Sequence, residues 1–345
     1  MSKTILAIDV GYGNTKLVFG RDGNYWKDLV FKSVAPTDKS GSGGQPAGIS
    51  DTLDRITVPI GAEHYIVGPD AIIAGGDAIL STNFLEQPQY MALLRGAIYY
   101  SMKNANAMQK HIDVLVLGLP VSNWRKRQAE LIRIGEGPHP IPVPIEFRAE
   151  FGEQLAVTIG KVVVLPQPMG ALRNALMHVP KRELNLDTSI HMVIDIGYGT
   201  LDWFVSSGLR PELQRSGSLK GGVSQLLKHV ANAAGDKLGI GTLNVNEVEK
   251  GLAAGVMQAD GVELRMAQFA HIMESEAERV VQRFVNAIDI DLSVKTIHLV
   301  GGGASFYLQA LRKVFKSHQI AIDSNTVLAN ARGFYLYGEA LASML

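Results

Sequence analysis

One short motif occurs twice in this sequence. Asp-Val-Gly-Tyr-Gly stands at residues 9–13, and Asp-Ile-Gly-Tyr-Gly stands at residues 195–199. Each copy follows an apolar, β-prone run, at residues 4–8 and 190–194. Glycines permit positive φ and close approach of the backbone, so the amides of such a turn can point at phosphate oxygens. The Asp at the strand end is placed to orient Mg²⁺ or its waters. The repeat therefore predicts two similar half-domains that close on one nucleotide.

The length and the order of the patterns also favour two domains. A chain of 345 residues fits two medium domains better than one large core. Each half has strand patterns first and helix patterns later, which predicts two α/β domains with mixed sheets. The formal net charge is zero, so no global attraction to nucleic acid or to a membrane is expected. The absence of cysteine excludes disulfides, thiolate metal sites and cysteine nucleophiles.

The first apolar run is too short for a signal peptide, and no apolar stretch is long enough to span a bilayer. We therefore expect a cytoplasmic protein that has no membrane partner. The nine histidines include no His-x-x-x-His spacing, which argues against a transition-metal site.

Apolar periodicity and turn residues set the expected elements. Strands are predicted at 5–10, 16–20, 25–31, 55–60, 63–67, 112–117, 161–165, 190–195, 201–207, 211–216 and 296–300. Helices are predicted at 89–110, at 122–134 with Ser122 as N-cap, at 169–178, from 223, at 262–288, from 305 and from 330. The Gly- and Ser-rich segment 37–50 is expected to be a mobile loop within one domain.

Three further features carry candidate chemistry. Lys16, seven residues after Asp9, can bring an ammonium to a terminal phosphate as the chain leaves the turn. For a single Gly-x-Gly turn an exposed lysine is the more ordinary interpretation, but the second copy favours a site. Gly301-Gly302-Gly303 follows an apolar run and precedes a predicted helix, so a base or ribose can lie against its backbone. The amide of Gln167, which stands between two prolines, can orient a water for attack on a γ-phosphate.

Two other segments fit a structural role as well as a functional one. The small residues of Asn330-Ala331-Arg332-Gly333-Phe334 allow close helix packing, with or without a hinge between domains. The basic cluster Arg125-Lys126-Arg127 is more typical of a solvent-facing helix than of a contact with nucleic acid or protein.

Taken together, the motifs resemble those of the superfamily that contains actin, the sugar kinases and the heat-shock chaperone ATPases. Residues 9–16 resemble its first phosphate motif, 195–200 its second, and 299–305 its adenosine motif. Residues 165–171 and 330–334 resemble its two connecting motifs. The motifs occur in the family's order over nearly the whole chain. Within the superfamily, the Asn-Ala-Arg-Gly-Phe sequence and the length are similar to those of plasmid-segregation actins of the ParM/StbA type and of archaeal actin-like proteins.

The resemblance implies two ribonuclease H-like α/β domains that flank a nucleotide cleft. Domain I would comprise residues 1–180 plus 331–345, and domain II residues 181–330. The last helix would return to the first domain. The ligands would be ATP and Mg²⁺, and the activity would be ATP hydrolysis.

By the same resemblance, Asp9 and Asp195 would hold Mg²⁺ through water and act with Gln167 in catalysis. The residues that would contact the nucleotide are Gly11, Tyr12, Gly13, Asn14, Thr15, Lys16, Gly197, Tyr198, Gly199, Thr200, Gly301, Gly302 and Gly303. Glu249 or Lys250 would reach the nucleoside, although a solvated helix face explains both equally well. Gln167 stands where segregation actins often carry Glu and true actin carries Gln, so the resemblance does not set the hydrolysis rate.

The leading functional hypothesis is an ATPase that polymerises head to tail. The filament would position plasmid DNA through a DNA-binding adaptor protein, without direct contact with nucleic acid. In such a filament the 37–50 loop would order at a subunit contact, or it would have no role. The alternative is a small-molecule kinase of the same superfamily, for which Asp202 is the best-placed carboxylate base. A chaperone-like ATP-dependent module is the third possibility.

Overall fold

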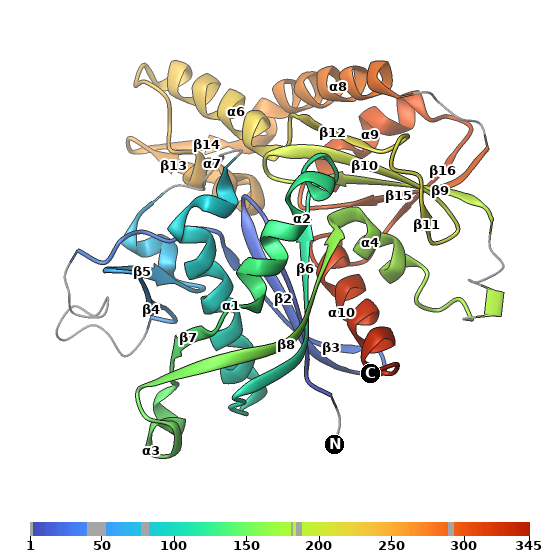
Figure 1. The fold of residues 1–345 in the computed structure, drawn as a ribbon. Coiled ribbons are helices and arrows are strands. Elements are labelled where there is room, and N and C mark those ends of the chain that lie inside the picture. The colour runs from blue at the N-terminus through green and yellow to red at the C-terminus, as the bar shows by residue number, and fades with distance from the viewer. Residues whose placement is uncertain (1–2, 40–52, 77–82, 181, 184–187, 289–292) are drawn as a thin grey trace. The chain divides into compact units, whose positions relative to one another are not determined.

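The fold consists of two compact units, each of which we describe by itself (Figure 1). A computed structural model describes residues 3–39, 53–76, 83–180, 182–183, 188–288 and 293–345. Unit 1 comprises residues 1–184 together with 328–345, and unit 2 comprises residues 185–327. Most of the predicted 37–50 loop lies outside the described residues.

Unit 1 is built on a six-stranded mixed sheet in the order β3-β2-β1-β6-β8-β7. Its strands are β1 (Ile5–Val10), β2 (Asn14–Asp22), β3 (Tyr25–Lys32), β6 (His111–Leu119), β7 (His139–Pro142) and β8 (Gln154–Pro166). β1, β6 and β8 run parallel, whereas β1–β2, β2–β3 and β7–β8 are antiparallel. The parallel strands therefore end at the same edge of the sheet, where Asp9 and the start of the helix after β8 both lie.

Five helices and a small hairpin complete the described part of unit 1. The helices are α1 (Pro88–Ala105), α2 (Val121–Glu136), α3 (Arg148–Phe151), α4 (Gln167–Ala175) and α10 (Ala329–Ala342). The two-stranded sheet is β4 (Ile56–Ile60) with β5 (Glu63–Val67), and the 3₁₀ turns are Ala71–Ala74, Phe84–Glu86 and Ile145–Phe147. The last helix thus packs in the first unit.

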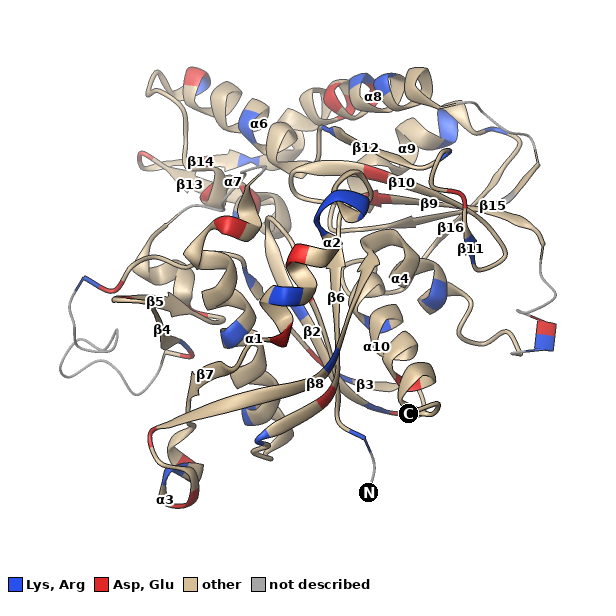
Figure 2. Cartoon of the chain, in the orientation of Figure 1, with Lys and Arg blue, Asp and Glu red and all other residues tan. Residues whose placement is uncertain are grey.

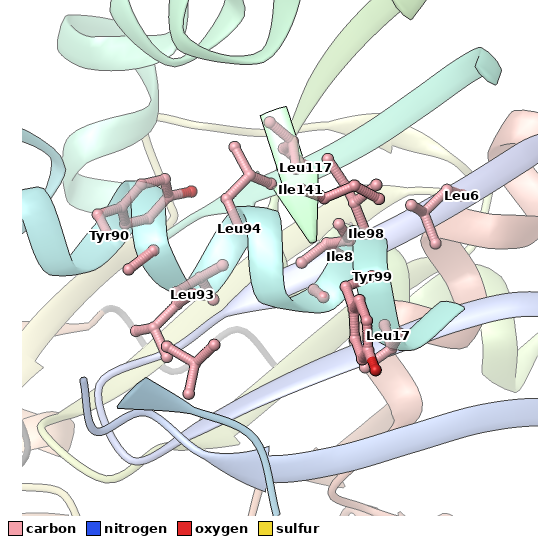
Figure 3. Close-up of a cluster of buried hydrophobic side chains, with 14 of the residues drawn as sticks. Leu6, Ile8, Leu17, Tyr90, Leu93, Leu94, Ile98, Tyr99, Leu117 and Ile141 are labelled. Carbon is pink, nitrogen blue, oxygen red and sulfur yellow. The ribbon is translucent and has the colours of Figure 1, made fainter. Parts of the chain in front are cut away.

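Helix α1 covers one face of the unit 1 sheet (Figure 3). Alternate residues of β1, among them Leu6 and Ile8, point toward α1 and pack on its Leu94 and Ile98. Pro at the first helical position and a left-handed Asn106 at φ 51° bound the helix, so it ends before the predicted residue 110.

Helices α4 and α10 pack on the opposite face of this sheet. Phe334 of α10 is fully buried among side chains such as Val116 and Leu165. The two helices cross at Gly170 and Gly333, where a Cβ on Gly333 would overlap the Gly170 carbonyl. Glycine is therefore required for the observed distance between the helices.

Unit 2 is built on a second mixed sheet in the order β11-β10-β9-β15-β16, with β12 also paired to β10. Its strands are β9 (Ile190–Ile196), β10 (Thr200–Ser207), β11 (Arg210–Pro211), β12 (Gly217–Lys220), β15 (Val294–Val300) and β16 (Gln319–Ile322). The helices are α6 (Val223–Leu238), α7 (Val245–Ala254), α8 (Ala270–Ala287) and α9 (Ala304–Val314), and the hairpin is β13 (Val256–Ala259) with β14 (Val262–Arg265).

The two sheets share their strand pattern, as the repeated motif predicts. In each unit the motif strand, β1 or β9, pairs antiparallel with the strand that follows it. On its other side it pairs parallel with a later strand, β6 or β15, which in turn pairs parallel with β8 or β16. The prediction of two similar α/β domains with mixed sheets is confirmed.

The predicted helix at 262–288 is wrong at its first eight residues. Val262–Arg265 is strand β14, a 3₁₀ turn follows at Met266–Phe269, and the helix begins at Ala270. Asp260 and Gly261 have φ values of 49° and 73° and turn β13 into β14. An Asp-Gly pair at positive φ is typical of a tight hairpin, and this local signal outweighs the helical spacing of the residues after it.

Other expected boundaries also differ. Helix α2 begins at Val121, and Pro120, not Ser122, occupies the N-cap position. The predicted strand at 211–216 is mostly a turn, since the Arg215 amide bonds to the Glu212 carbonyl and pairing with β10 resumes only at Gly217. Strand β8 starts seven residues before the predicted Lys161, because it also pairs with β7 in the Pro-rich segment. None of the described helices is both long and apolar enough to cross a lipid bilayer.

A pair of histidines in the unit 2 sheet makes its stability sensitive to acid. The rings of His298 (β15) and His191 (β9) lie 5.7 Å apart. Burial and then the charge of His191 lower the pKa of His298 from 6.5 to about 4, against an opposing effect of Asp323. The folded state therefore binds this proton less readily than the unfolded state, and stability is lost as the pH falls from 6.5 toward 4.

We predict that His298→Gln reduces the acid sensitivity of the protein. Between pH 7 and pH 5 the free energy of unfolding should fall by about 2 kcal/mol more in the unchanged protein than in the variant. Urea unfolding at the two pH values measures this difference. His271→Gln, at an exposed position on α8, is the matched control and should behave as the unchanged protein does. Equal pH dependence in the His298 variant would contradict the assignment.

Candidate functional site

Strand alternation places the first motif carboxylate. In β1 the apolar residues Leu6, Ile8 and Val10 point to the α1 face, so Asp9 points to the face that α4 and α10 cover. Asp9 and Lys16 are direct partners in the β1–β2 register, and their side chains therefore share that face.

Asp9 is fully buried and is held by two donors. The Lys16 ammonium Nζ lies 2.9 Å from Asp9 Oδ2 and is itself only 16% exposed. Gln167, the first residue of α4, donates from Nε2 to Asp9 Oδ1 at 2.6 Å. Because a carboxylate only accepts hydrogen bonds, the donor must be the amide NH₂ of Gln167, and its carbonyl oxygen is left as an acceptor. The structure thus brings together three of the predicted residues from segments far apart in the sequence.

The first turn is held tightly by backbone and hydroxyl contacts. The Gly11 amide bonds to the Asn14 carbonyl at 3.1 Å, which closes the turn. The hydroxyls of buried Thr15 and Ser33 lie 2.9 Å apart and tie β2 to the chain after β3. The glycines of both motif turns do not have positive φ, so these turns do not use the backbone freedom that glycine permits. A Cβ at Gly11 would lie 3.5 Å from Lys16 Nζ, so glycine here keeps open the space beside the ammonium.

The second copy has a different partner for its acid. Asp195 (β9) pairs in register with Asp202 (β10), so two buried carboxylates share one face of the unit 2 sheet. Asp202 accepts hydrogen bonds on both oxygens, from Thr200 Oγ1 at 2.6 Å and from the Ser218 hydroxyl of β12. Two hydroxyl donors thus hold Asp202 in place, and the base role proposed for it in a kinase stays a prediction.

Three glycine segments meet around Asp195 in unit 2. They are the turn 197–199, the pair 221–222 and the predicted adenosine segment 301–303. The α6 amides of Val223 and Ser224 bond to the carbonyls of the 197–199 turn, at 3.0 and 2.8 Å. The amide of Gly303 bonds to the Ile196 carbonyl at 2.9 Å. Each motif turn is thus supported by the backbone around it.

The sheet requires the absence of a side chain at Gly301. Its φ is 89°, which L side chains rarely adopt, and a Cβ would overlap Asp195 Oδ1 and the Ile196 carbonyl. The backbone of the 301–303 segment therefore lies directly against the acid of the second motif. Of the three glycines, Gly302 is the one whose Cβ position faces open space.

The carboxylates of the two motifs are too few to bind Mg²⁺ by themselves, so waters and phosphate oxygens would have to complete its coordination. In the described part of the chain, no three His, Cys, Asp or Glu side chains are grouped as a metal site. Mg²⁺ in proteins usually keeps several waters and binds one or two carboxylates plus substrate phosphates. Asp9 and Asp195 are suited to such outer contacts, and Lys16 supplies a cation for phosphate oxygens.

Two family models match the chain. Residues 7–170 match the model of the N-terminal domain of actin-like proteins, and residues 193–313 match that of the C-terminal domain of the archaeal, MreB-like actin homologues. The chain belongs to the actin-like superfamily. Its first matched segment contains Asp9, Lys16 and Gln167, and its second contains Asp195 and Gly301. No curated protein matched the sequence.

Solved structures confirm the actin-like fold over the whole chain. A ParM filament from Clostridium botulinum is 17% identical with a TM-score of 0.76, covering 99% of this chain and 100% of that one. An archaeal actin homologue, Ta0583, in complex with ADP is 18% identical with a TM-score of 0.73, at 97% and 99% coverage. The apo form of the pSK41 ParM protein is 19% identical with a TM-score of 0.70, at 100% and 99% coverage.

Two further predictions for this actin-like chain concern side chains on the helices α7 and α2. Glu249 and Lys250 lie on α7, which packs mainly on α6 and β13, and Lys250 bonds to exposed Glu247 at 2.8 Å. Their nucleoside contact stays a prediction. Figure 2 shows basic residues near the start of α2, followed by alternating charges along the helix. Within that basic group Arg127 binds Glu86 and Glu130, which supports a structural role for it.

Sequence reasoning missed the contact of Gly222 with the second motif turn and the burial of Tyr90. A Cβ on Gly222 would overlap the Gly197 carbonyl, so a glycine is required where the chain before α6 meets the second motif turn. The strand–glycine–helix pattern around it is the same signal that identified the 301–303 segment. Tyr90 is buried near Asp9, and burial together with that charge raises the pKa of its phenol. No sequence pattern links Tyr90 to Asp9, since 81 residues separate them.

The buried ion pair in the first motif gives a stability prediction. Lys16→Met leaves the Asp9 carboxylate buried without its cation, which should lower the free energy of unfolding by about 3–5 kcal/mol without ligand. Asp9→Asn combined with Lys16→Met removes both charges and should recover most of that loss. Urea unfolding of the two variants measures the difference. Equal losses in the single and double variants would contradict the ion pair.

Proposed function

We propose that this actin-like chain binds Mg²⁺ and ATP, hydrolyses the ATP and polymerises head to tail into filaments. The observation that carries the proposal is the duplicated strand–Asp–turn device, with Asp9 bound by Lys16 and Gln167 in one unit and Asp195 beside Gly301 in the other. The ADP complex of the archaeal homologue supports the nucleotide, and the Clostridium botulinum ParM filament supports the polymer.

In this proposal the unliganded contacts of Asp9 are exchanged when the nucleotide binds. Lys16 Nζ leaves Asp9 for a phosphate oxygen, where its charge offsets that of the phosphates. Asp9 and Asp195 would hold Mg²⁺ through its waters, and the charge that the ion supplies would offset that of the phosphates. The backbones of residues 11–15 and 197–200 grip the phosphates, and residues 301–303 accommodate the adenosine. Gln167 orients the attacking water through its amide.

The domain assignment belongs to the same proposal. Residues 1–180 plus 331–345 act as domain I and residues 181–330 as domain II, each contributing one motif to the nucleotide. Self-association of identical subunits by a head-to-tail contact that does not close gives an open filament. We further propose that the filament serves plasmid DNA segregation through a DNA-binding adaptor protein in the cytoplasm. This last step rests on the similarity to segregation actins.

The proposal predicts nucleotide binding that depends on magnesium and on both acids. Asp9→Ala or Asp195→Ala should each weaken Mg²⁺·ATP binding by about 10–100-fold, as expected for groups that orient metal-bound water. Calorimetry with and without Mg²⁺ measures the affinity. Asp22→Ala and Glu263→Ala, at exposed positions in units 1 and 2, are the matched controls and should bind as the unchanged protein does. Full affinity in the double Asp9→Ala, Asp195→Ala variant would reject the site.

Light scattering and sedimentation distinguish the filament hypothesis from the kinase hypothesis. Mg²⁺·ATP should raise the scattering and pellet the protein, and electron microscopy should show filaments. ATP turnover that begins only after a sugar is added, without pelleting, would instead identify a small-molecule kinase. The similarity to the Clostridium botulinum ParM filament leads us to expect the first result.

A further inference from the structure

One aromatic ring of the last helix lies directly behind Gln167. Phe334 of α10 is fully buried, and its ring occupies the space beside two glycines. A Cβ on Gly118, at the end of β6, would lie 2.5 Å from Phe334 Cε2 and Cζ. A Cβ on Gly170, in α4, would lie 2.7 Å from Phe334 Cδ1 and Cε1. The ring therefore fills a slot between the sheet edge and α4 that any larger residue at either glycine would close.

Gln167 shares this slot with the ring. The same Cβ position on Gly118 lies 3.1 Å from Gln167 Cγ, so the side chain of Gln167 passes over Gly118 next to Phe334. Beyond Cγ, the amide reaches Asp9 at 2.6 Å. The χ angles of Gln167 are thus restricted on one side by the slot and at the tip by one hydrogen bond.

The backbone that carries the ring is itself fixed. α10 crosses α4 at Gly333 and Gly170, where the chains are too close for a Cβ on Gly333. Phe334 follows Gly333 directly, so the depth of the ring in the slot depends on this crossing. A shift of α10 along α4 would move the ring relative to the Gln167 side chain.

We propose that Phe334 is a positioning residue for Gln167: its ring, seated against Gly118, holds the amide in the orientation that directs a water for ATP hydrolysis. The inference rests on the proposed function, because it assigns a support to the residue that would orient this water. Phe334 does not touch the nucleotide in this arrangement, and nucleotide affinity is therefore expected to be independent of it.

The test uses substitutions on both sides of the contact. Gly118→Ala places a methyl group against both the ring and Gln167, and Phe334→Leu removes the ring atoms Cε2 and Cζ. Each should lower the turnover number of ATP hydrolysis by about tenfold, while the dissociation constant for Mg²⁺·ATP changes by less than about twofold. Because leucine leaves room for the new methyl group, the double variant should hydrolyse ATP faster than Gly118→Ala alone.

Gly338→Ala is the matched control in the same helix. Its methyl group would lie 2.6 Å from Ile5 Cγ2, so it crowds the interface of α10 with the sheet away from Gln167. It should lower the melting temperature and leave the turnover number unchanged. If Gly338→Ala and Gly118→Ala slow turnover equally, Phe334 is only a core residue. Unchanged turnover in folded Gly118→Ala and Phe334→Leu proteins would also overturn the inference.

A second measurement separates this inference from the proposed function. The side-chain amide resonances of Gln167 in the full-length protein should shift in Gly118→Ala, return toward their original positions in the double variant, and stay unchanged in Gly338→Ala. If the unchanged protein does not hydrolyse ATP, the proposed function fails, and these resonances still decide whether Phe334 positions Gln167. Identical spectra in the Gly118 and Gly338 variants would refute the positioning role.

Discussion

The two-residue alternation of the motif strands is the constraint on which the site depends. In β1 it directs apolar residues to α1 and the one carboxylate, Asp9, to the α4 face. In β9 it directs Ile194 and Ile196 into the helix-covered core and Asp195 to the other face. A buried carboxylate is costly unless it is paired or hydrogen-bonded. The apolar core therefore determines which face of each sheet carries the motif acid. Because the buried acid needs partners, hydrogen-bond donors must lie on that same face.

The motif acid has a different cross-strand partner in each of the two copies. Position eight is Lys16 in the first copy and Asp202 in the second, and each is the cross-strand partner of the motif acid. The first pair is electrically neutral, whereas the second joins two carboxylates, of which Asp202 accepts hydrogen bonds from two hydroxyl groups. Opposite charges across a strand pair attract and like charges repel. The ammonium of the first pair therefore attracts an anion in place of Asp9, whereas the Asp195–Asp202 pair attracts a cation.

The sequence predicts the parts of this molecule that have a local signal. The repeat, the apolar runs and the glycine segments were enough for two similar α/β units and for the strands that end at Asp9 and Asp195. The hairpin at Val256–Arg265 was not predicted. The prediction gave more weight to the helical spacing of the residues after it than to the turn signal of Asp260-Gly261. The contact of Gln167 with Asp9 joins residues 158 positions apart, and no spacing rule reaches that far. Only the resemblance to the family connected them.

Glycine has a different function at these positions from the one its backbone freedom suggests. Among the glycines of the two motif turns and of the 301–303 segment, Gly301 is the one that adopts positive φ. Elsewhere the missing Cβ is what matters: Gly118 and Gly170 admit the Phe334 ring, and Gly333 admits the α4 backbone. A close-packed interior does not absorb an added methyl group without a shift of its neighbours. Because those neighbours include Gln167, the same glycines that allow α4 and α10 to cross also limit where the amide beside Asp9 can move.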